Sequence, residues 1–327
     1  MAGRPGGPQS IVPANQMLTP AQMAAESWRL VTLAAELNTT ESTLQWAARR
    51  RLVHNAVTCP RCARPATLVA RADVTDGHHW RCARCRFTKS VRSGSFFERS
   101  HLSISSIVVI AYCWAVDMPQ KLIAREADVQ TKATIVDWCN FLREVAGDYI
   151  MRRPTEIGGF DNNGWPVVVE VDESKYYHRK YHRGQWRKGH WVFGGFERGT
   201  GKSFLVEVPD RTRRTLYRII REHILPGSHI VHDGWRAYDT IHRIRRGIYT
   251  HQKIVHQRHF VDPNDPEVHT QNIENLWMRA KRKLRRQFGT SEPLFPSYLH
   301  EFLFREMTRD REVFSAVLEC IRHSYPV

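Results

Sequence analysis

The chain has 327 residues, of which 42% are hydrophobic and ten are tryptophan, so its composition excludes a disordered protein and allows two or three domains. Its 49 Lys and Arg residues outnumber its 33 Asp and Glu residues, which gives a formal net charge of +16. So large an excess favours a polyanionic partner, most simply nucleic acid, although a ribosome-like role or binding to a membrane surface would also use it.

The N-terminal part predicts a tail followed by two helices. Residues 1–20 are rich in Gly, Pro, Gln and Asn and are expected to be a flexible tail. They lack the apolar core of a secretion signal. Helices are expected at about 21–37 and 40–52, within an N-terminal helical region that ends at residue 56. Asn38 and Glu41 stand three residues apart between them, as in a capping box.

Residues 57–95 contain two cysteine pairs with the spacing C-x2-C-x19-C-x2-C. Four thiolates from two such turns can surround one tetrahedral Zn²⁺ and leave no open coordination position. The pattern therefore predicts a zinc ribbon with one structural Zn²⁺, and the alternative is four unrelated reduced cysteines. The expected ligands are Cys59, Cys62, Cys82 and Cys85.

Residues 100–150 are expected to be helical and to include a helix-turn-helix, with the turn at about 128–130. A plain helical hairpin is the alternative, because the motif is loosely defined in sequence. The apolar run at 104–116 is too short to span a bilayer, so no membrane contact is expected. The Gly- and Asn-rich segment at 152–165 predicts a domain boundary.

From residue 165 onward the pattern changes to β-branched runs alternating with amphipathic segments, which predicts a mixed α/β sheet covered by helices. Strands are expected at 166–172, 190–197, 203–208, 228–234 and 252–260, with a hairpin turn at 199–202. Helices are expected at 214–225, 269–287 and 298–324.

The helix at 269–287 carries one acid, Glu274, among six Lys and Arg residues. On a helical wheel Glu274 lies at the edge of an apolar stripe, and no i,i+4 cation is available to it. The simplest alternative is an acid favoured by the helix dipole, worth under about 1 kcal/mol. The stripe consists of Ile273, Trp277, Ala280, Leu284 and Phe288.

Two further carboxylates, Asp172 and Asp233, each end a predicted buried strand. Ends of adjacent strands and one helix position can bring three carboxylates together, and such oxygen-rich sites hold Mg²⁺ or Mn²⁺. Two ions would serve phosphodiester displacement. Competing acids are interpreted as surface residues or as supports behind the ligands: Glu170, which shares the strand face of Asp172 and is the strongest rival, and Glu173, Asp161, Asp210 and Asp239.

Four stretches carry a resemblance: VVVEVDESKYYHRK, IVHDGWRAY, VHTQNIENLW and YLHEFLFR, with the cysteine module upstream. In this order, over about residues 20–320, the chain resembles the Merlin superfamily of DDE cut-and-paste transposases and related bacterial insertion-sequence transposases. The resemblance implies a ribonuclease-H-like catalytic domain, expected at 165–327, with Asp172, Asp233 and Glu274 at the three acidic positions. Glu306 and Met307 depart from the family, since relatives often carry an Asn-Arg pair there.

A basic, aromatic insert at 174–190 follows the first acidic position directly. Its cations can neutralise phosphates and its aromatic residues can stack on unpaired bases, although a solvated basic hairpin is the alternative. His269 and Asn272 are expected to support the catalytic pocket from behind the ligands. The expected DNA-contacting residues are Lys175, Arg179, Lys180, Arg183, Arg187 and Lys188 of the insert, and Lys281, Arg282 and Arg285 of the basic helix.

The resemblance therefore implies a Mg²⁺-dependent DNA transposase that cuts at terminal inverted repeats and joins 3′ ends to target DNA. Its partners would be double-stranded DNA and further copies of itself, as a homodimer or higher oligomer. The alternatives are a domesticated DNA-binding protein without transposition activity and a zinc-ribbon transcription factor. The expected location is the nucleus of a eukaryotic host, which the resemblance favours, and otherwise the bacterial cytoplasm.

Overall fold

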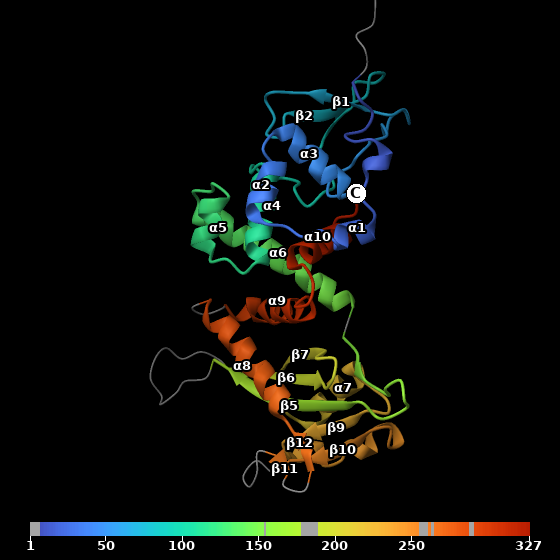
Figure 1. The fold of residues 1–327 in the computed structure, drawn as a ribbon, viewed down its shortest axis with the longest axis vertical. Helices are drawn as coiled ribbons and strands as arrows, with labels where there is room; N and C mark the ends of the chain where they lie inside the picture. Colours follow the sequence, from blue (N-terminus) through green and yellow to red (C-terminus); the bar gives the residue numbers. More distant parts are fainter. Residues whose placement is uncertain (1–6, 154, 178–188, 255–260, 263–264, 288–290) are drawn as a thin grey trace, which may run out of the picture. The chain divides into compact units, whose positions relative to one another are not determined.

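The computed structural model describes residues 7–153, 155–177, 189–254, 261–262, 265–287 and 291–327 (Figure 1). The chain forms two compact units. Unit 1 contains Met1–Tyr149 and Thr308–Val327, and unit 2 contains Ile150–Met307. The predicted domain boundary at 152–165 lies close to the first of these junctions. None of the helices in the described residues is long and apolar enough to cross a membrane.

Unit 1 begins with the short turn η1 (Ala14–Gln16) and the helices α1 (Pro20–Ala24), α2 (Leu30–Glu36) and α3 (Thr40–Arg49). The helix expected at 21–37 is interrupted, because Glu26 turns inward to pair with Arg50 and Trp28 packs edge-on against Trp46 at 5.9 Å. A buried guanidinium needs such a partner, and this requirement outweighs the continuous helical pattern.

Two local predictions in this region are wrong. The cap of α3 is Thr39, whose hydroxyl accepts the backbone N–H of Ser42 at 3.0 Å, and not Asn38. The predicted tail is also partly ordered: Val12 is only 2% exposed, and its backbone bonds the Asn55 side chain at 2.8 and 3.0 Å. Residues 1–6 lie outside the described residues. A buried apolar residue with a satisfied backbone holds the remainder of this segment in place.

The cysteine module forms a three-stranded antiparallel sheet of β1 (Thr67–Ala70), β2 (His78–Arg81) and β3 (Thr88–Ser90). Trp80 of β2 is fully buried and forms the centre of this small layer. Three helices follow, α4 (Ile104–Ala115), α5 (Gln120–Glu126) and α6 (Lys132–Arg152). The two helices and the short turn that were predicted as a helix-turn-helix are α5, α6 and the residues between them; their binding to DNA stays a prediction.

The predicted helix at 298–324 is two helices, α9 (Phe295–Met307) and α10 (Val313–Ser324). The polar run at 308–312 offers no apolar face to bury, so the helix stops there. Beyond the break Phe314 stacks on Trp46 at 6.5 Å and meets Tyr112 edge-on at 5.3 Å, both in unit 1. The last residues therefore belong to unit 1, whereas the sequence placed them in the catalytic domain.

Unit 2 is built on a five-stranded sheet in the order β10-β9-β5-β6-β7. Its strands are β5 (Val168–Tyr176), β6 (His190–Glu197), β7 (Ser203–Val208), β9 (His229–His232) and β10 (Thr250–Lys253). The strands β5, β6 and β7 are antiparallel neighbours, whereas β9 and β10 run parallel to β5. This mixed sheet confirms the predicted α/β class.

Short elements complete unit 2. The strand β4 (Ile157–Gly158) pairs with β8 (Ile224–Leu225), and β11 (Val261–Asp262) pairs with β12 (Asp265–His269). Single turns of 3₁₀ helix are η2 (Arg236–Tyr238), η3 (Ile241–Arg246) and η4 (Glu292–Leu294). The strand expected at 252–260 begins earlier, as β10, and residues 255–260 lie outside the described part of the chain.

Helices cover the two faces of the sheet. On one face α7 (Arg213–His223) packs Leu216, Ile219 and Ile220 into a cluster with Val169 and Phe193. On the other face α8 (Gln271–Arg285) crosses β5 and β6, as Figure 1 shows. Because side chains alternate between faces along a strand, Glu170 and Asp172 point toward α8, and their neighbour Glu173 points toward the α7 face.

Candidate active site

Asp172 lies on β5, and Asp233 directly follows the parallel strand β9. Val171 of β5 pairs with His232, the last residue of β9, so Asp172 and Asp233 come next to each other just past this pair. Gly234 has a φ of +83°, which lets the chain turn away sharply after β9. Asp233 accepts the backbone N–H of Trp235 at 3.0 Å within this turn. The structure thus brings two of the three predicted carboxylates together.

Asp172 is partly buried beneath helix α8. The Trp277 indole Nε1 donates to Asp172 Oδ2 at 2.9 Å, and the ring passes over Gly194, which faces Asp172 across the ladder. A Cβ at Gly194 would lie 2.7 Å from that ring, so only glycine allows this approach. Burial raises the pKa of Asp172 to about 7, and repulsion by Asp233 and Glu173 adds to the increase. A divalent cation would relieve both effects.

Glu274 lies in the first turn of α8 and is exposed. It stands one helical turn before Trp277, on the helix that contacts Asp172. Among the residues that the structure describes, only the four cysteines bring three or more potential ligand atoms within 4.8 Å of one another. The third predicted carboxylate therefore lies on the helix that contacts Asp172, but it is not gathered into a close cluster with the two aspartates.

Glu170 fastens the start of α8 to the central strand. Its side chain is fully buried, and one oxygen accepts the backbone N–H groups of Asn272 and Ile273 at 3.0 Å each. The other oxygen accepts Asn272 Nδ2 and Arg198 Nε at 2.7 Å each. Helix α8 has no side-chain cap of its own at Thr270, so this carboxylate satisfies N–H groups that the helix leaves open. Glu170 is a structural anchor in this geometry.

The two residues predicted to support the pocket contact this anchor. Asn272 bonds Glu170 through both its backbone and its side chain. His269 places Nδ1 3.5 Å from a Glu170 oxygen, and its carbonyl accepts Arg198 Nη2 at 2.6 Å. They act on the start of α8 and not directly on either aspartate.

Glu173 is the buried acid of the opposite face. Its side chain is 2% exposed, accepts the Tyr238 hydroxyl and lies 3.9 Å from an Arg211 nitrogen. Burial raises its pKa to about 7. Glu173 is therefore not a surface acid, because the strand alternation places it inside the α7 layer; its role as a support behind the ligands stays a prediction.

Three histidines extend from the turn after Asp233 to the surface. The Gly234 N–H donates to His232 Nδ1 at 3.1 Å, so His232 must present its other nitrogen to His251, 3.0 Å away. His251 in turn contacts His242 at 3.2 Å, and His242 is exposed. Burial lowers the pKa of His232 to about 3, which keeps the ring neutral. Sequence reasoning missed this series, because its members come from β9, η3 and β10.

The predicted DNA-contacting residues fall into two groups. Arg282 and Arg285 are exposed on α8, and Lys281 places its Nζ 5.4 Å from the Tyr176 ring centre. In the insert Lys175 is exposed. The rest of the predicted insert contacts lie outside the described residues, and they are Arg179, Lys180, Arg183, Arg187 and Lys188.

The four cysteines form a compact cluster in unit 1. Their Sγ atoms are 3.3–3.6 Å apart in the contacts between Cys59 and Cys85, Cys62 and Cys82, and Cys62 and Cys85. Each pair starts a tight turn that ends in a left-handed residue, Ala63 or Arg86. Backbone N–H groups of the second turn lower the pKa of Cys82 to about 6. Four clustered sulfurs with a stabilised thiolate fit a tetrahedral Zn²⁺.

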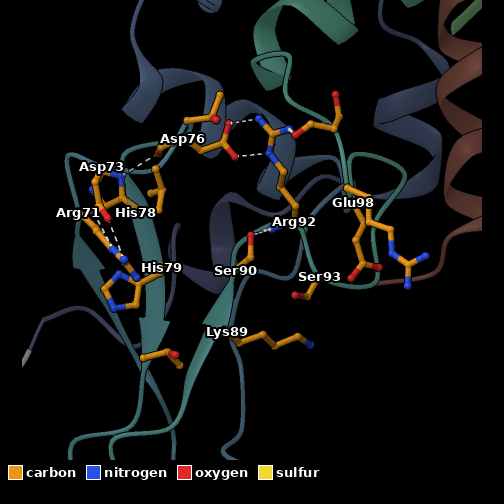
Figure 2. Close-up of a pocket in the computed structure, with 15 residues that line it drawn as sticks. Arg71, Asp73, Asp76, His78, His79, Lys89, Ser90, Arg92, Ser93 and Glu98 are labelled. Atoms are coloured by element: carbon orange, nitrogen blue, oxygen red, sulfur yellow. Dashed lines mark hydrogen bonds and ion pairs between the residues drawn. The ribbon is translucent and has the colours of Figure 1, made fainter. Parts of the chain in front are cut away.

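A polar pocket of about 530 Å³ lies beside the sheet of unit 1, and Figure 2 shows its lining. The Arg92 guanidinium bonds the Asp76 carboxylate, and the same arginine donates to the Ser100 carbonyl at 2.9 Å. Arg71 and Asp73 form a second, exposed pair at 2.7 Å. Two of the arginines and two of the acids are thus bonded to each other, which stabilises the module and leaves little net charge for a ligand.

Comparisons with known proteins point to one family. The description "ISXO2-like transposase domain" matches residues 163–307. An uncharacterized transposase-like protein of Haemophilus influenzae is 33% identical over 104 residues, which make up 32% of this chain and 80% of that protein.

Two solved structures were also found to be similar. The catalytic core domain of BIV integrase is 15% identical and has a TM-score of 0.30 over 44% of this chain and 84% of that chain. The HTLV-2 integrase catalytic core in complex with magnesium is 13% identical, with a TM-score of 0.29 over 42% and 83%. Both likenesses are weak.

Proposed function

The chain belongs to the ISXO2-like transposase domain family, and from this premise we propose that it cuts DNA at the ends of a mobile element and joins the 3′ ends to target DNA. The single observation that carries the proposal is the pair Asp172 and Asp233, which lie next to each other on β5 and just after β9, with Asp172 partly buried and repelled by Asp233. A closer relation to the Merlin superfamily belongs to the same proposal.

The proposed active site consists of Asp172, Asp233 and Glu274. Two Mg²⁺ or Mn²⁺ ions held there would supply an activated water or 3′-hydroxyl and charge stabilisation of the leaving oxygen. Trp277 fixes the orientation of Asp172 through its indole N–H. Glu170 holds the first turn of α8, and with it the backbone that presents Glu274.

Helix α8 would contribute DNA contacts from its second half. Lys283 is 3.2 Å from the buried Glu301 of α9, which also receives Arg305 at 3.0 Å, so this lysine anchors the helix. The exposed Arg282 and Arg285 are left to face the phosphate backbone. A division between anchoring and exposed cations explains why a helix that packs on a core is so basic.

Recognition of the element ends is proposed for unit 1. Its cysteine cluster would hold one structural Zn²⁺, and the helices α5 and α6 would act as the helix-turn-helix. Two DNA ends must be brought together for joining, so the active form is proposed to be a homodimer or a higher oligomer. The nucleus of a eukaryotic host or the cytoplasm of a bacterium stays the proposed location.

The test replaces each proposed ligand separately: Asp172→Ala, Asp233→Ala and Glu274→Ala. Each variant should lose Mg²⁺-dependent nicking of a labelled element-end duplex by roughly a thousandfold or more, because metal positioning supplies several kcal/mol to the transition state. A gel shift on the same proteins should show retained DNA binding, since each change removes a negative charge. Asp239→Ala is the matched control, because Asp239 is an exposed acid just beyond the same turn.

Two results would contradict the proposal in different ways. Retained nicking by the Glu274→Ala variant would exclude that residue as the third ligand. A wild-type protein that binds element ends with every divalent cation supplied but never cuts them would instead be a domesticated DNA-binding protein.

A further inference from the structure

Two tryptophans and an arginine form a layered stack on the α7 side of the sheet, at the turn that follows Asp233. The Arg211 guanidinium lies 3.9 Å from the Trp191 ring centre and 4.5 Å from the Trp235 ring centre. The Trp235 indole N–H donates to the Arg211 carbonyl at 3.3 Å, which ties the turn after β9 to the start of α7. The Lys175 ammonium is also near Trp191, 5.5 Å from its ring centre.

Trp191, at one end of the stack, packs on the protein core, and Trp235, at the other end, is exposed to solvent. Arg211 also contacts the buried Glu173 at 3.9 Å, and Trp191 packs against the sheet core. Trp235, by contrast, is 39% exposed, although an indole that served only the fold would be expected to bury most of its surface. Trp235 follows Asp233 by two residues, and its partner Arg211 contacts Glu173 on the α7 side of the sheet, so the exposed ring belongs to the turn that carries one of the proposed ligands.

We propose that the exposed ring of Trp235 binds an unpaired base at a DNA strand end, with Arg211 and Trp191 as its support. The proposal rests on the proposed function, because strand cleavage next to Asp233 would create such an end. A base inside a duplex has both faces covered by its neighbours, whereas a terminal or unpaired base offers a free face for stacking.

The surrounding charge suits this ligand. Lys175, Arg211 and the exposed Arg236 provide cations for the adjoining phosphates, and the acid in contact with the stack, Glu173, is buried behind it. A guanidinium held between two rings also makes the outer ring a fixed platform, so little side-chain entropy is lost on binding. Stacking of this kind is tolerant of base sequence and selects for single-stranded character.

The experiment compares two labelled DNAs that share the same duplex, one blunt and one with a short unpaired 3′ extension, in EDTA so that no cleavage occurs. The full-length wild type should bind the extended DNA more tightly by roughly tenfold. Trp235→Ala should abolish this difference, and Trp235→Phe should keep most of it because a ring remains. Trp165→Ala is the matched control, since Trp165 is 71% exposed and lies before the opposite end of β5.

A third DNA, with abasic sites in the extension, separates stacking from phosphate binding, and it should bind no better than the blunt duplex. Equal binding of the abasic and ordinary extensions would overturn the proposal, as would an undiminished preference in the Trp235→Ala variant. If wild-type protein binds the extended and blunt DNAs equally well but still nicks DNA with Mg²⁺, only the base-stacking role of Trp235 is rejected. If the preference holds while the Asp172→Ala variant still nicks, the proposed active site falls instead.

Discussion

Replacing Glu170 with glutamine tests whether this acid is an anchor or the third metal ligand. Two oxygens of Glu170 accept four donors, so a glutamine leaves two donors facing an NH₂ group whichever way its amide is turned. Each unsatisfied buried donor costs about 1–3 kcal/mol, and unit 2 should therefore lose roughly 4 kcal/mol of unfolding free energy. For a domain of this size that corresponds to a fall in Tm of roughly 10 °C.

The assay is thermal unfolding of the full chain in EDTA, followed by near-ultraviolet circular dichroism. Glu222→Gln is the matched control, because Glu222 forms an exposed pair with Arg218 at 3.8 Å and its loss should change stability by less than about 0.5 kcal/mol. Because the chain has two compact units, two unfolding transitions are expected. The Glu170→Gln change should shift only the transition of unit 2.

An increase in the Tm of the Glu170→Gln variant would refute the role of Glu170 as a structural anchor. An acid that served only as a metal ligand would repel Asp172 in metal-free protein, so replacing it with a neutral residue would raise the Tm. A Glu170→Gln variant that melts at or above the wild-type temperature while losing all nicking activity would mean that Glu170 binds metal.

Three further outcomes are expected. Burial raises the pKa of Asp172 from 3.8 to about 7, so the protonated side chain favours the folded state: this stabilisation is full below about pH 4 and is lost as pH rises through about 7. The Asp172→Asn variant should therefore have a higher Tm than wild type at about pH 8 in EDTA, and equal Tm values would contradict the raised pKa. Wild-type protein should contain one Zn²⁺ per chain by metal analysis, and Cys82→Ser should release it and lower the Tm of unit 1; freshly purified protein without zinc would exclude the site. Replacing Arg179, Lys180 and Arg183 with alanine should reduce the salt dependence of DNA binding by about 0.9 in log–log slope for each phosphate that is no longer neutralised, and an unchanged slope would mean that these residues are only solvated.

The sequence by itself determined the features that depend on local spacing. The two cysteine pairs predicted a cluster that the structure contains, because each pair folds its own tight turn. The apolar stripe of α8 predicted its buried face, and Ile273, Trp277, Ala280 and Leu284 are all buried. The positions of Asp172 and Asp233 at the ends of apolar runs likewise predicted that the ends of adjacent strands could bring them together; that β5 and β9 are parallel was learnt from the structure.

Only the tertiary structure decided what depends on partners distant in sequence. Glu170 and Asp172 share a strand face, and nothing in their local pattern shows that Glu170 accepts the N–H groups of a helix a hundred residues later. The same holds for Arg211, whose two tryptophan neighbours come from β6 and from the turn after β9. A buried carboxylate or guanidinium needs a hydrogen-bonding partner, and that partner can come from any part of the chain. Hydrophobic periodicity predicts which face of an element is buried, but it does not predict which residue contacts that face.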